Sequence, residues 1–362
     1  MKHKNHFLKT YKNLKVLITG STGFKGAWLS YWLHLLGAKV VGIGLKPEKN
    51  FILYKSLNLN KKIKQYFVDI RNFQKLNRIV KKEKPNIIFH LAAQSIVSLS
   101  YKNPRQTVET NVLGSTNILE TVRNNNISNL VFITSDKCYL NLDKESSYKE
   151  TDTLGGLDNY SSSKASAEII FSSYFHSFFK DKYLNVASAR AGNVIGGGDS
   201  KKDRIIPDII RSVKKKRDVI IRNPLSTRPW QHVLEPLSGY LLLGHMLIKK
   251  RLKVNIKPNW NFGPYKKNCK KVKELTKYLI KNINTKIKIK IKNNKKFHES
   301  NLLSLNISKS HKELGWYPTL NFQETIKLTS SWYDAYLKKE DLEKITHNQI
   351  KTFTAKMNIE KK

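Results

Sequence analysis

The stretch TGSTGFKG (19–26) decides the fold, because it stands between an apolar run and a helical pattern. The run KVLIT (15–19) predicts a buried strand, and FKGAWLSYWLHLLG (24–37) predicts a helix. The turn between them contains three glycines, Gly20, Gly23 and Gly26. Glycines at such a turn allow a tight bend, close approach of the backbone to a pyrophosphate, and tight packing of helix on strand. The stretch therefore predicts a dinucleotide site with its phosphates at a helix N-terminus.

Short apolar runs alternate with helical patterns through the first half of the chain. Strand-like runs are KVVGIGL (39–45), QYFVD (65–69), NIIFHLA (86–92), NLVFI (129–133) and NVASAR (185–190), and helical patterns cover 73–83, 105–124 and 159–180. Strands separated by helices predict a parallel sheet with helices on both faces. The expected fold is thus a Rossmann-type, doubly wound α/β sheet.

Beyond Ala191 the alternation gives way to shorter and more basic elements, which predicts a smaller C-terminal substrate-binding lobe. We expect residues 1–190 to form the dinucleotide-binding domain, with a segment of about 229–250 returning to it. Residues 191–335 would form the substrate-binding lobe, and 336–362 a polar C-terminal tail.

Lysine and arginine outnumber aspartate and glutamate by 67 to 27, a formal net charge of +40. Clustered cations would indicate nucleic-acid binding, but here the charge is spread along a chain rich in Lys, Asn and Ile. Compositional drift is therefore favoured, and no nucleic-acid partner is expected. No apolar run is long enough for a membrane span, and the N-terminal stretch MKHKNHFLKTYKN lacks an apolar region and a cleavage site, so we do not expect it to be a signal peptide. The two cysteines, Cys138 and Cys269, fit a reducing compartment, the cytoplasm. No cluster has the spacing of a metal site.

The acidic residue that usually binds the adenosine ribose, about 20 residues beyond the glycines, is missing. Lys46 stands near its place, in GLKPEKN. Glu48 could substitute from the loop, or Lys46 could favour a 2′-phosphate, so this stretch leaves NAD and NADP open.

Two further motifs carry candidate chemistry. TSDKCY (134–139) follows the apolar run NLVFI, so Asp136 and Lys137 stand where a buried strand ends. An Asp–Lys ion pair capping the strand is the plain structural interpretation. YSSSK places Tyr160 and Lys164 four apart, on one face of a helix. A nearby ammonium favours phenolate, so we expect Lys164 to lower the pKa of Tyr160 and prepare it for proton exchange with a sugar hydroxyl.

Together these motifs resemble the extended short-chain dehydrogenase/reductases and, within them, the CDP-glucose 4,6-dehydratases. The resemblance covers about residues 8–335. General motifs are TGSTGFKG, HLAAQ (90–94), ETNVLGS (109–115) and YSSSK; more particular ones are TSDKCY, SARAGNVIGGGD (188–199), DRIIPDI (203–209) and RPWQHVLEPLSGYLLL (228–243).

The resemblance implies an NAD-dependent lyase that turns CDP-glucose into CDP-4-dehydro-6-deoxyglucose and water, early in deoxysugar synthesis for surface polysaccharide. In similar dehydratases the 4-hydroxyl is oxidised first, and the resulting ketone acidifies the proton on carbon 5. Water then leaves across carbons 5 and 6, and the same hydride returns to carbon 6.

The resemblance also implies residue roles. Tyr160 with Lys164 would be the base for the oxidation, Thr134 would bind the 4-oxygen, and Asp136 would protonate the departing 6-hydroxyl, which requires a pKa raised by burial. Lys137, where many related dehydratases have glutamate, would be the carbon-5 base or a charge stabiliser. Expected cofactor contacts are Gly20, Thr22, Gly23, Phe24, Lys25, Gly26, Asp69, Ile70, Leu91, Ala92, Ala93 and Asn111, besides Tyr160 and Lys164. Expected substrate contacts are Gln94, Ser95, Asn193, Arg204 and Arg228. A homodimer is expected from the family.

Two other functions stay open at this stage. A UDP-, dTDP- or GDP-sugar dehydratase or epimerase, or a reductase linked to NADP, would keep the fold; an epimerase needs the tyrosine but no acid for a leaving 6-hydroxyl. The second open function is that of a basic binding protein without turnover. The presence of Thr134, Asp136, Tyr160 and Lys164 argues against it.

Overall fold

A seven-stranded parallel sheet forms the larger part of the computed structural model, which describes residues 6–48, 51–143, 146–180, 184–252, 258–283, 285, 287–291 and 303–357. The strand order is β11-β6-β5-β4-β1-β2-β3. The bounds are β1 (Lys15–Thr19), β2 (Lys39–Gly44), β3 (Lys64–Phe67), β4 (Ile87–His90), β5 (Asn129–Ile133), β6 (Asn185–Ala191) and β11 (Asn259–Phe262). The predicted Rossmann-type sheet is confirmed, and its first six strands begin and end within two residues of the predicted runs.

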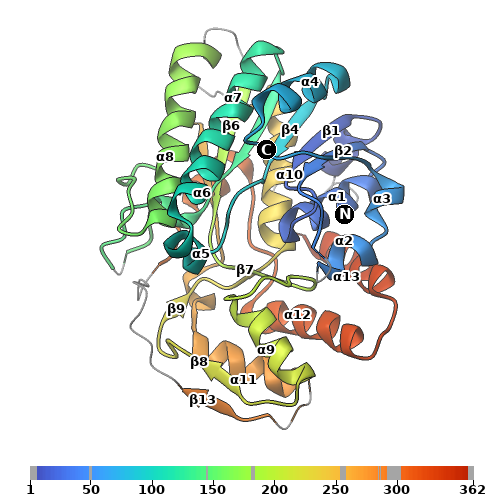
Figure 1. Ribbon diagram of the computed structural model, residues 1–362, viewed down its shortest axis with the longest axis vertical. Helices are drawn as coiled ribbons and strands as arrows, with labels where there is room; N and C mark the ends of the chain where they lie inside the picture. The colour runs from blue at the N-terminus through green and yellow to red at the C-terminus, as the bar shows by residue number, and fades with distance from the viewer. Residues whose placement is uncertain are drawn as a thin grey trace.

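Helices cover both faces of the sheet (Figure 1). One face is covered by α4 (Phe73–Glu83), α7 (Gly114–Asn124) and α8 (Asn159–Tyr174), and the other by α1 (Phe24–Leu35) and α10 (Leu234–Ile248). Strand β1 shows why both faces are apolar: Val16 and Ile18 pack in the core of α1 and α10, while Leu17 packs in the core of α4 and α7. The predicted helix over 105–124 consists of α6 (Pro104–Val108), the π-helical turn η2 (Glu109–Leu113) and α7, preceded by α5 (Val97–Lys102).

A smaller group of elements lies below the sheet in Figure 1. It contains α9 (Ile205–Lys214), β8 (Val219–Ile221) paired in parallel with β13 (Ile289–Ile291), β9 (Thr227–Arg228) paired with β12 (Lys270–Lys271), and α11 (Val272–Asn282). Strand β7 (Val194–Ile195) pairs with β10 (Gln231–His232) where the chain leaves the sheet.

The range 191–335, expected as the substrate-binding lobe, requires one correction. Strand β11 lies within it but pairs with β6 at the edge of the large sheet, Asn259 opposite Ser188. The physical reason is that α10 packs against β5 and β6 and so returns the chain to the sheet edge, where β11 adds in parallel.

The C-terminal segment expected as a polar tail forms a docked helix, α13 (Leu342–Lys356), after α12 (Phe322–Leu337). Ile350 and Phe353 are buried, and the Phe353 ring meets Trp32 of α1 edge-on at 6.0 Å between centroids. Glu343 accepts a hydrogen bond from Tyr31 (3.3 Å). It also pairs with Lys62 of the short helix α3 (Leu59–Lys62), which follows α2 (Ile52–Ser56). The chain thereby returns from α12 to the dinucleotide-binding half. Across the described residues, none of the helices is long and apolar enough to cross a membrane.

Candidate active site

The glycine turn after β1 has the shape required to hold a pyrophosphate. Gly20 has φ +74°, and a Cβ there would lie 2.8 Å from the Ala92 nitrogen. A Cβ on Gly26 would lie 2.0 Å from the Gly20 carbonyl oxygen, so α1 could not pack on this turn with any larger residue. Within the described chain no side chain caps α1 at Gly23, and its first turn contains no acidic residue. Its N-terminal N–H groups can therefore donate to an anion, and this donor set fits a dinucleotide.

The HLAAQ segment is fixed beside this turn by the end of β1. The Ala92 N–H donates to Thr19 Oγ1 (3.2 Å), which also bonds His90 Nδ1 (2.7 Å). The Asn111 amide bonds Gln94 through both main-chain groups and donates to Ser163 of α8 (2.9 Å). Asn111 therefore holds the expected cofactor wall against the helix that carries Tyr160.

Two expected adenosine contacts are engaged with other charges. Asp69 pairs with Arg71 (2.8 Å), which also pairs with Glu109. Glu48, the possible substitute for the ribose acid, is exposed and pairs with Lys201 (3.1 Å). Ile70 packs on Gly114, where an added Cβ would lie 2.6 Å from Ile70 Cδ1.

Tyr160 and Lys164 lie buried, one turn apart, in the first half of α8. Burial lowers the pKa of Lys164 to about 8 and raises the pKa of Tyr160 to about 12. The Tyr160 pKa is held down in part by a hydrogen bond with Ser135 and by the charge of Arg204. We expected Lys164 to lower this pKa, but desolvation of the phenolate is the largest effect on Tyr160 and raises it.

The expectation for Thr134 is also wrong. Its hydroxyl donates to Glu168, which is buried on α8, so it does not face a substrate oxygen. The backbone at Ser135 is extended (φ −155°, ψ 159°), so successive side chains point in opposite directions. The hydroxyl next to Tyr160 is therefore that of Ser135. Sequence reasoning missed Ser135, although alternation at the end of β5 was the signal that could have identified it.

Asp136 begins the short helix η3 (Asp136–Cys138) with its carboxylate almost fully buried. Oδ1 accepts from Ser135 Oγ (2.9 Å), while Oδ2 has no hydrogen-bond partner among the residues that the structure describes. Burial raises the pKa of Asp136, and the charges of Lys137 and Arg228 oppose this rise only in part. A buried acid with a raised pKa and an unengaged oxygen is suited to donate a proton to a leaving hydroxyl.

The slot that holds this carboxylate is formed by Gly192 and Pro229. A Cβ on Gly192 would lie 2.8 Å from Asp136 Oδ2 and 3.1 Å from Pro229 Cγ. Gly192 was not singled out from the sequence, because nothing in SARAGNV shows which side chain it faces.

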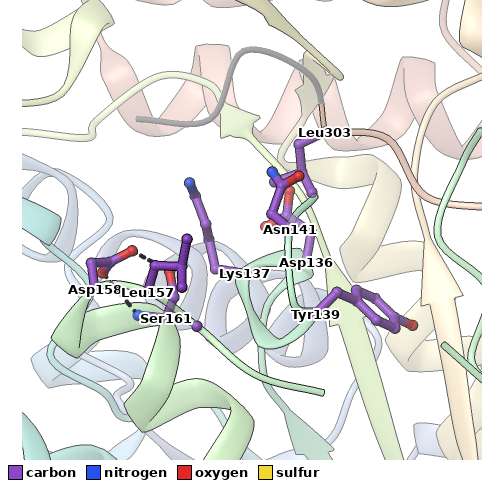
Figure 2. A pocket seen from close by; sticks show the side chains of 9 residues that line it. Asp136, Lys137, Tyr139, Asn141, Leu157, Asp158, Ser161 and Leu303 are labelled. Carbon is purple, nitrogen blue, oxygen red and sulfur yellow. Dashed lines mark hydrogen bonds between the residues drawn. The ribbon is translucent and has the colours of Figure 1, made fainter. Parts of the chain in front are cut away.

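Lys137 lines the same pocket as Asp136 but extends away from it, between Leu157 and Asn141 (Figure 2). These two charged groups, both described by the structure, form no ion pair with each other. The plain interpretation of an ion pair capping the strand is therefore wrong. Lys137 is half-buried, and its backbone N–H donates to Ser135 Oγ (3.2 Å).

The expected substrate contacts divide into two groups. Arg204 joins the two parts of the molecule, donating to Ser95 (2.6 Å) and pairing with Asp199 (2.9 Å), and its charge acts on Tyr160. Arg228 is buried, and its charge opposes in part the rise that burial causes in the pKa of Asp136.

The other group, Gln94 and Asn193, forms hydrogen bonds within the protein. Gln94 uses its amide to bond Ile96 of its own loop and Thr107 of α6, so its side chain is engaged within the protein, contrary to the expectation that it faces the sugar. Asn193 contributes its carbonyl, which accepts from the Gln231 N–H (3.1 Å).

Lys25 of the glycine turn directs its ammonium toward α10, where it lies 3.5 Å from the Tyr240 hydroxyl. Burial lowers the pKa of Lys25 to about 7, and repulsion from Lys164 and Arg204 adds to this effect. The Lys25 amine thus lies between the glycine turn and α10, and its surroundings disfavour the charged form. Among the described residues no group of three or more His, Cys, Asp or Glu side chains is placed to hold a metal ion.

Comparison with known proteins agrees with this geometry. The family model described as GDP-mannose 4,6 dehydratase matches residues 17–329. The chain is 42% identical over 338 residues to CDP-glucose 4,6-dehydratase of Salmonella typhimurium strain LT2, covering 92% of this chain and 94% of that protein. Two solved structures have the same fold. An epimerase of Methanothermobacter thermautotrophicus has a TM-score of 0.80 at 22% identity, covering 93% of this chain and 98% of its own. The dTDP-glucose 4,6-dehydratase of Bacillus anthracis, in complex with NAD, has a TM-score of 0.75 at 24% identity, covering 92% of this chain and 99% of its own.

Proposed function

This chain belongs to the GDP-mannose 4,6 dehydratase family, and from that premise we propose that it is an NAD-dependent lyase converting CDP-glucose into CDP-4-dehydro-6-deoxyglucose and water. One observation carries the dehydratase assignment: the buried Asp136 carboxyl, with a raised pKa and an unengaged Oδ2, lies in the same cluster as Ser135 and Tyr160. A 4-epimerase requires no such acid, because no hydroxyl leaves.

The glycine turn, the N-terminus of α1 and the HLAAQ wall would hold the dinucleotide. Bound NAD would supply the hydride acceptor at carbon 4 and the hydride donor at carbon 6. The ammonium of Lys164 and the phenol of Tyr160 lie on the α8 face that reaches the same end of the sheet.

The oxidation half of the reaction uses Tyr160 and Ser135. Tyr160 exchanges the proton of the 4-hydroxyl, and Ser135 and Arg204 favour its phenolate form against the cost of burial. Ser135, rather than Thr134, positions the 4-oxygen.

The elimination half uses the η3 turn. Asp136 protonates the departing 6-hydroxyl, and burial, which raises the pKa of this carboxyl, favours the protonated form that the step requires. Lys137, at the rim of the same pocket, removes the carbon-5 proton or stabilises the charge that develops there. Arg204 and Arg228 are assigned to the substrate diphosphate, since guanidinium groups bind its oxygens in pairs.

Assembly and location form a second part of the proposal. We propose a homodimer through the helices on the α7–α8 side, where the exposed apolar side chains include Tyr101, Val108, Leu113 and Ile169. We infer a cytoplasmic location from two unpaired cysteines, Cys138 and Cys269, and a place in deoxysugar synthesis for polysaccharide from the product. A single monomeric species on size-exclusion chromatography with light scattering would refute the dimer.

Mass spectrometry tests the reaction and its base preference together. The protein is incubated with NAD⁺ and, in parallel, with CDP-, UDP-, dTDP- and GDP-linked hexoses. We expect loss of one water from CDP-glucose, without net reduction of the cofactor. An isomer of equal mass, or stoichiometric reduced cofactor, would replace the dehydratase by an epimerase or a reductase.

A further inference from the structure

A buried ion pair lies behind the η3 turn and takes no part in the reaction described above. Arg190 of β6 donates to Glu168 of α8 at 2.7 Å, and the two side chains are 2% and 1% exposed. Ser188 adds a hydrogen bond to the same carboxylate (3.0 Å). A charged pair this deep in a protein carries a large desolvation cost, and apolar residues of similar volume can replace such pairs without loss of stability. Stability alone is therefore a weak explanation for its presence.

The pair is bonded to the TSDKCY segment on both sides of the catalytic residues. Just before them, the Thr134 hydroxyl donates to Glu168. Just after them, Arg190 donates to the Tyr139 hydroxyl (2.8 Å), and its guanidinium lies 5.0 Å from the Tyr139 ring centroid. Ser135, Asp136, Lys137 and Cys138 lie between these two anchors.

The same pair is also tied to the oxidation machinery. Tyr160, Lys164 and Glu168 follow one another at intervals of four along α8, so they share one face of the helix. The helix that carries Tyr160 is thus also hydrogen-bonded, through Glu168, to the segment that carries Asp136.

We propose that Glu168 and Arg190 are positioning residues that fix the η3 turn relative to Tyr160, and so bring the acid of the elimination and the base of the oxidation to one sugar. The pair touches neither substrate nor cofactor. It acts through Thr134 and Tyr139, and its role for catalysis rests on the proposed function.

The first test measures the turn itself and needs no substrate. Cys138 is fully buried in η3, and the half-buried Cys269 is removed in a Cys269→Ser background. The rate at which Cys138 reacts with a thiol reagent, far below the melting temperature and at low urea, then reports local opening of the turn. In the double variant Glu168→Met/Arg190→Met we expect labelling at least tenfold faster, without a matching fall in melting temperature. Unchanged labelling in this folded variant would overturn the proposal.

Two further variants separate positioning from general stability. Thr134→Val removes one anchor and leaves the ion pair, and we expect labelling several-fold faster than in the parent. Glu235→Gln alters a carboxylate that is equally buried but bonded to the backbone of Thr319 and Leu320, and should leave Cys138 labelling unchanged. If Glu235→Gln accelerated labelling as much as the double Met variant, the effect would be global and the proposal wrong.

The second test uses turnover of CDP-glucose by the holoenzyme. Because the loosened turn carries both Ser135 of the oxidation and Asp136 of the elimination, both steps should be slower in the double Met variant, and kcat should fall at least tenfold. Wild-type turnover with faster Cys138 labelling in the variant would refute the catalytic role. A wild-type enzyme that releases no water from CDP-glucose would refute the proposed function instead, and the labelling result would stand apart from it.

Discussion

The substitution Gly192→Ala would perturb the acid without altering any ionisable group. The new Cβ would lie 2.8 Å from Asp136 Oδ2, whereas ordinary contact begins at 3.4 Å, so the carboxylate has to retreat by about 0.6 Å. A second close contact of the new Cβ, with Pro229 Cγ at 3.1 Å, limits how far the backbone can yield. Overpacking of this kind costs about 1–3 kcal/mol of folding free energy. A misplacement approaching 1 Å lowers a reaction rate up to about a hundredfold.

The expected result is specific to one step. Tyr160 and Lys164 lie on α8, and the atoms nearest the new Cβ belong to Asp136 and Pro229, so carbon 4 is still oxidised while elimination is about ten- to a hundredfold slower. Rapid mixing with CDP-glucose should therefore show reduced nicotinamide accumulating in the variant and not in the wild type. Gly263→Ala is the matched control, because its Cβ would come no closer than 3.4 Å to any neighbour. Turnover of Gly192→Ala within twofold of the wild type would refute this account of the slot, as would loss of turnover without reduced cofactor.

Three other changes test separate parts of the site. Asp136→Asn should trap reduced cofactor and also raise the melting temperature at pH 7. Burial raises the pKa of Asp136, so above pH 3.8 this group keeps its proton longer in the native protein than in the unfolded chain. The native protein therefore loses stability as the pH rises, and the asparagine variant, which does not titrate, avoids that loss. A variant no more stable than the wild type would contradict the burial effect. Ser135→Ala should slow the oxidation itself about tenfold or more, without reduced cofactor, through loss of the hydrogen bond with Tyr160; single-turnover kinetics that match the wild type would return the role to another hydroxyl. Burial raises the pKa of Glu235 to about 8, so between pH 4.5 and 8 this group binds a proton in the native protein but not in the unfolded chain. Relative to Glu235→Gln, the wild type should therefore lose about 1.4 kcal/mol of unfolding free energy for each pH unit of rise in this range. Urea unfolding at pH 5.5 and 7.5 measures this slope, and parallel curves for the two proteins would exclude it.

Local patterns predicted the parts of the molecule that local chemistry determines. The glycine turn, the strand ending at Ile133 and the four-residue interval between Tyr160 and Lys164 are properties of short segments, and the structure places them as expected. The sheet followed from the alternation of apolar runs and helices.

The rest depended on contacts between distant segments. Thr134 and Ser135 are adjacent and both carry a hydroxyl. Which of the two points toward Tyr160 depends on where the alternation of the strand continues beyond Ile133, and the residue types in TSDK do not show this. Gly192 matters only because Asp136 lies against it, and Glu168 only because β6 places Arg190 beside it. The polarity of the C-terminal helix likewise concealed Phe353, which packs on Trp32 over 300 residues earlier in the chain.

The central claim is that one active site removes water from CDP-glucose and returns the same hydride to the sugar. The most direct measurement uses CDP-glucose carrying deuterium on carbon 4, incubated with the protein and NAD⁺ and followed by mass spectrometry and NMR. We predict a 4-dehydro product that has lost one water and holds the deuterium on carbon 6, with no reduced cofactor left over. Intact sugar, or water loss with the deuterium missing from carbon 6, would contradict this account.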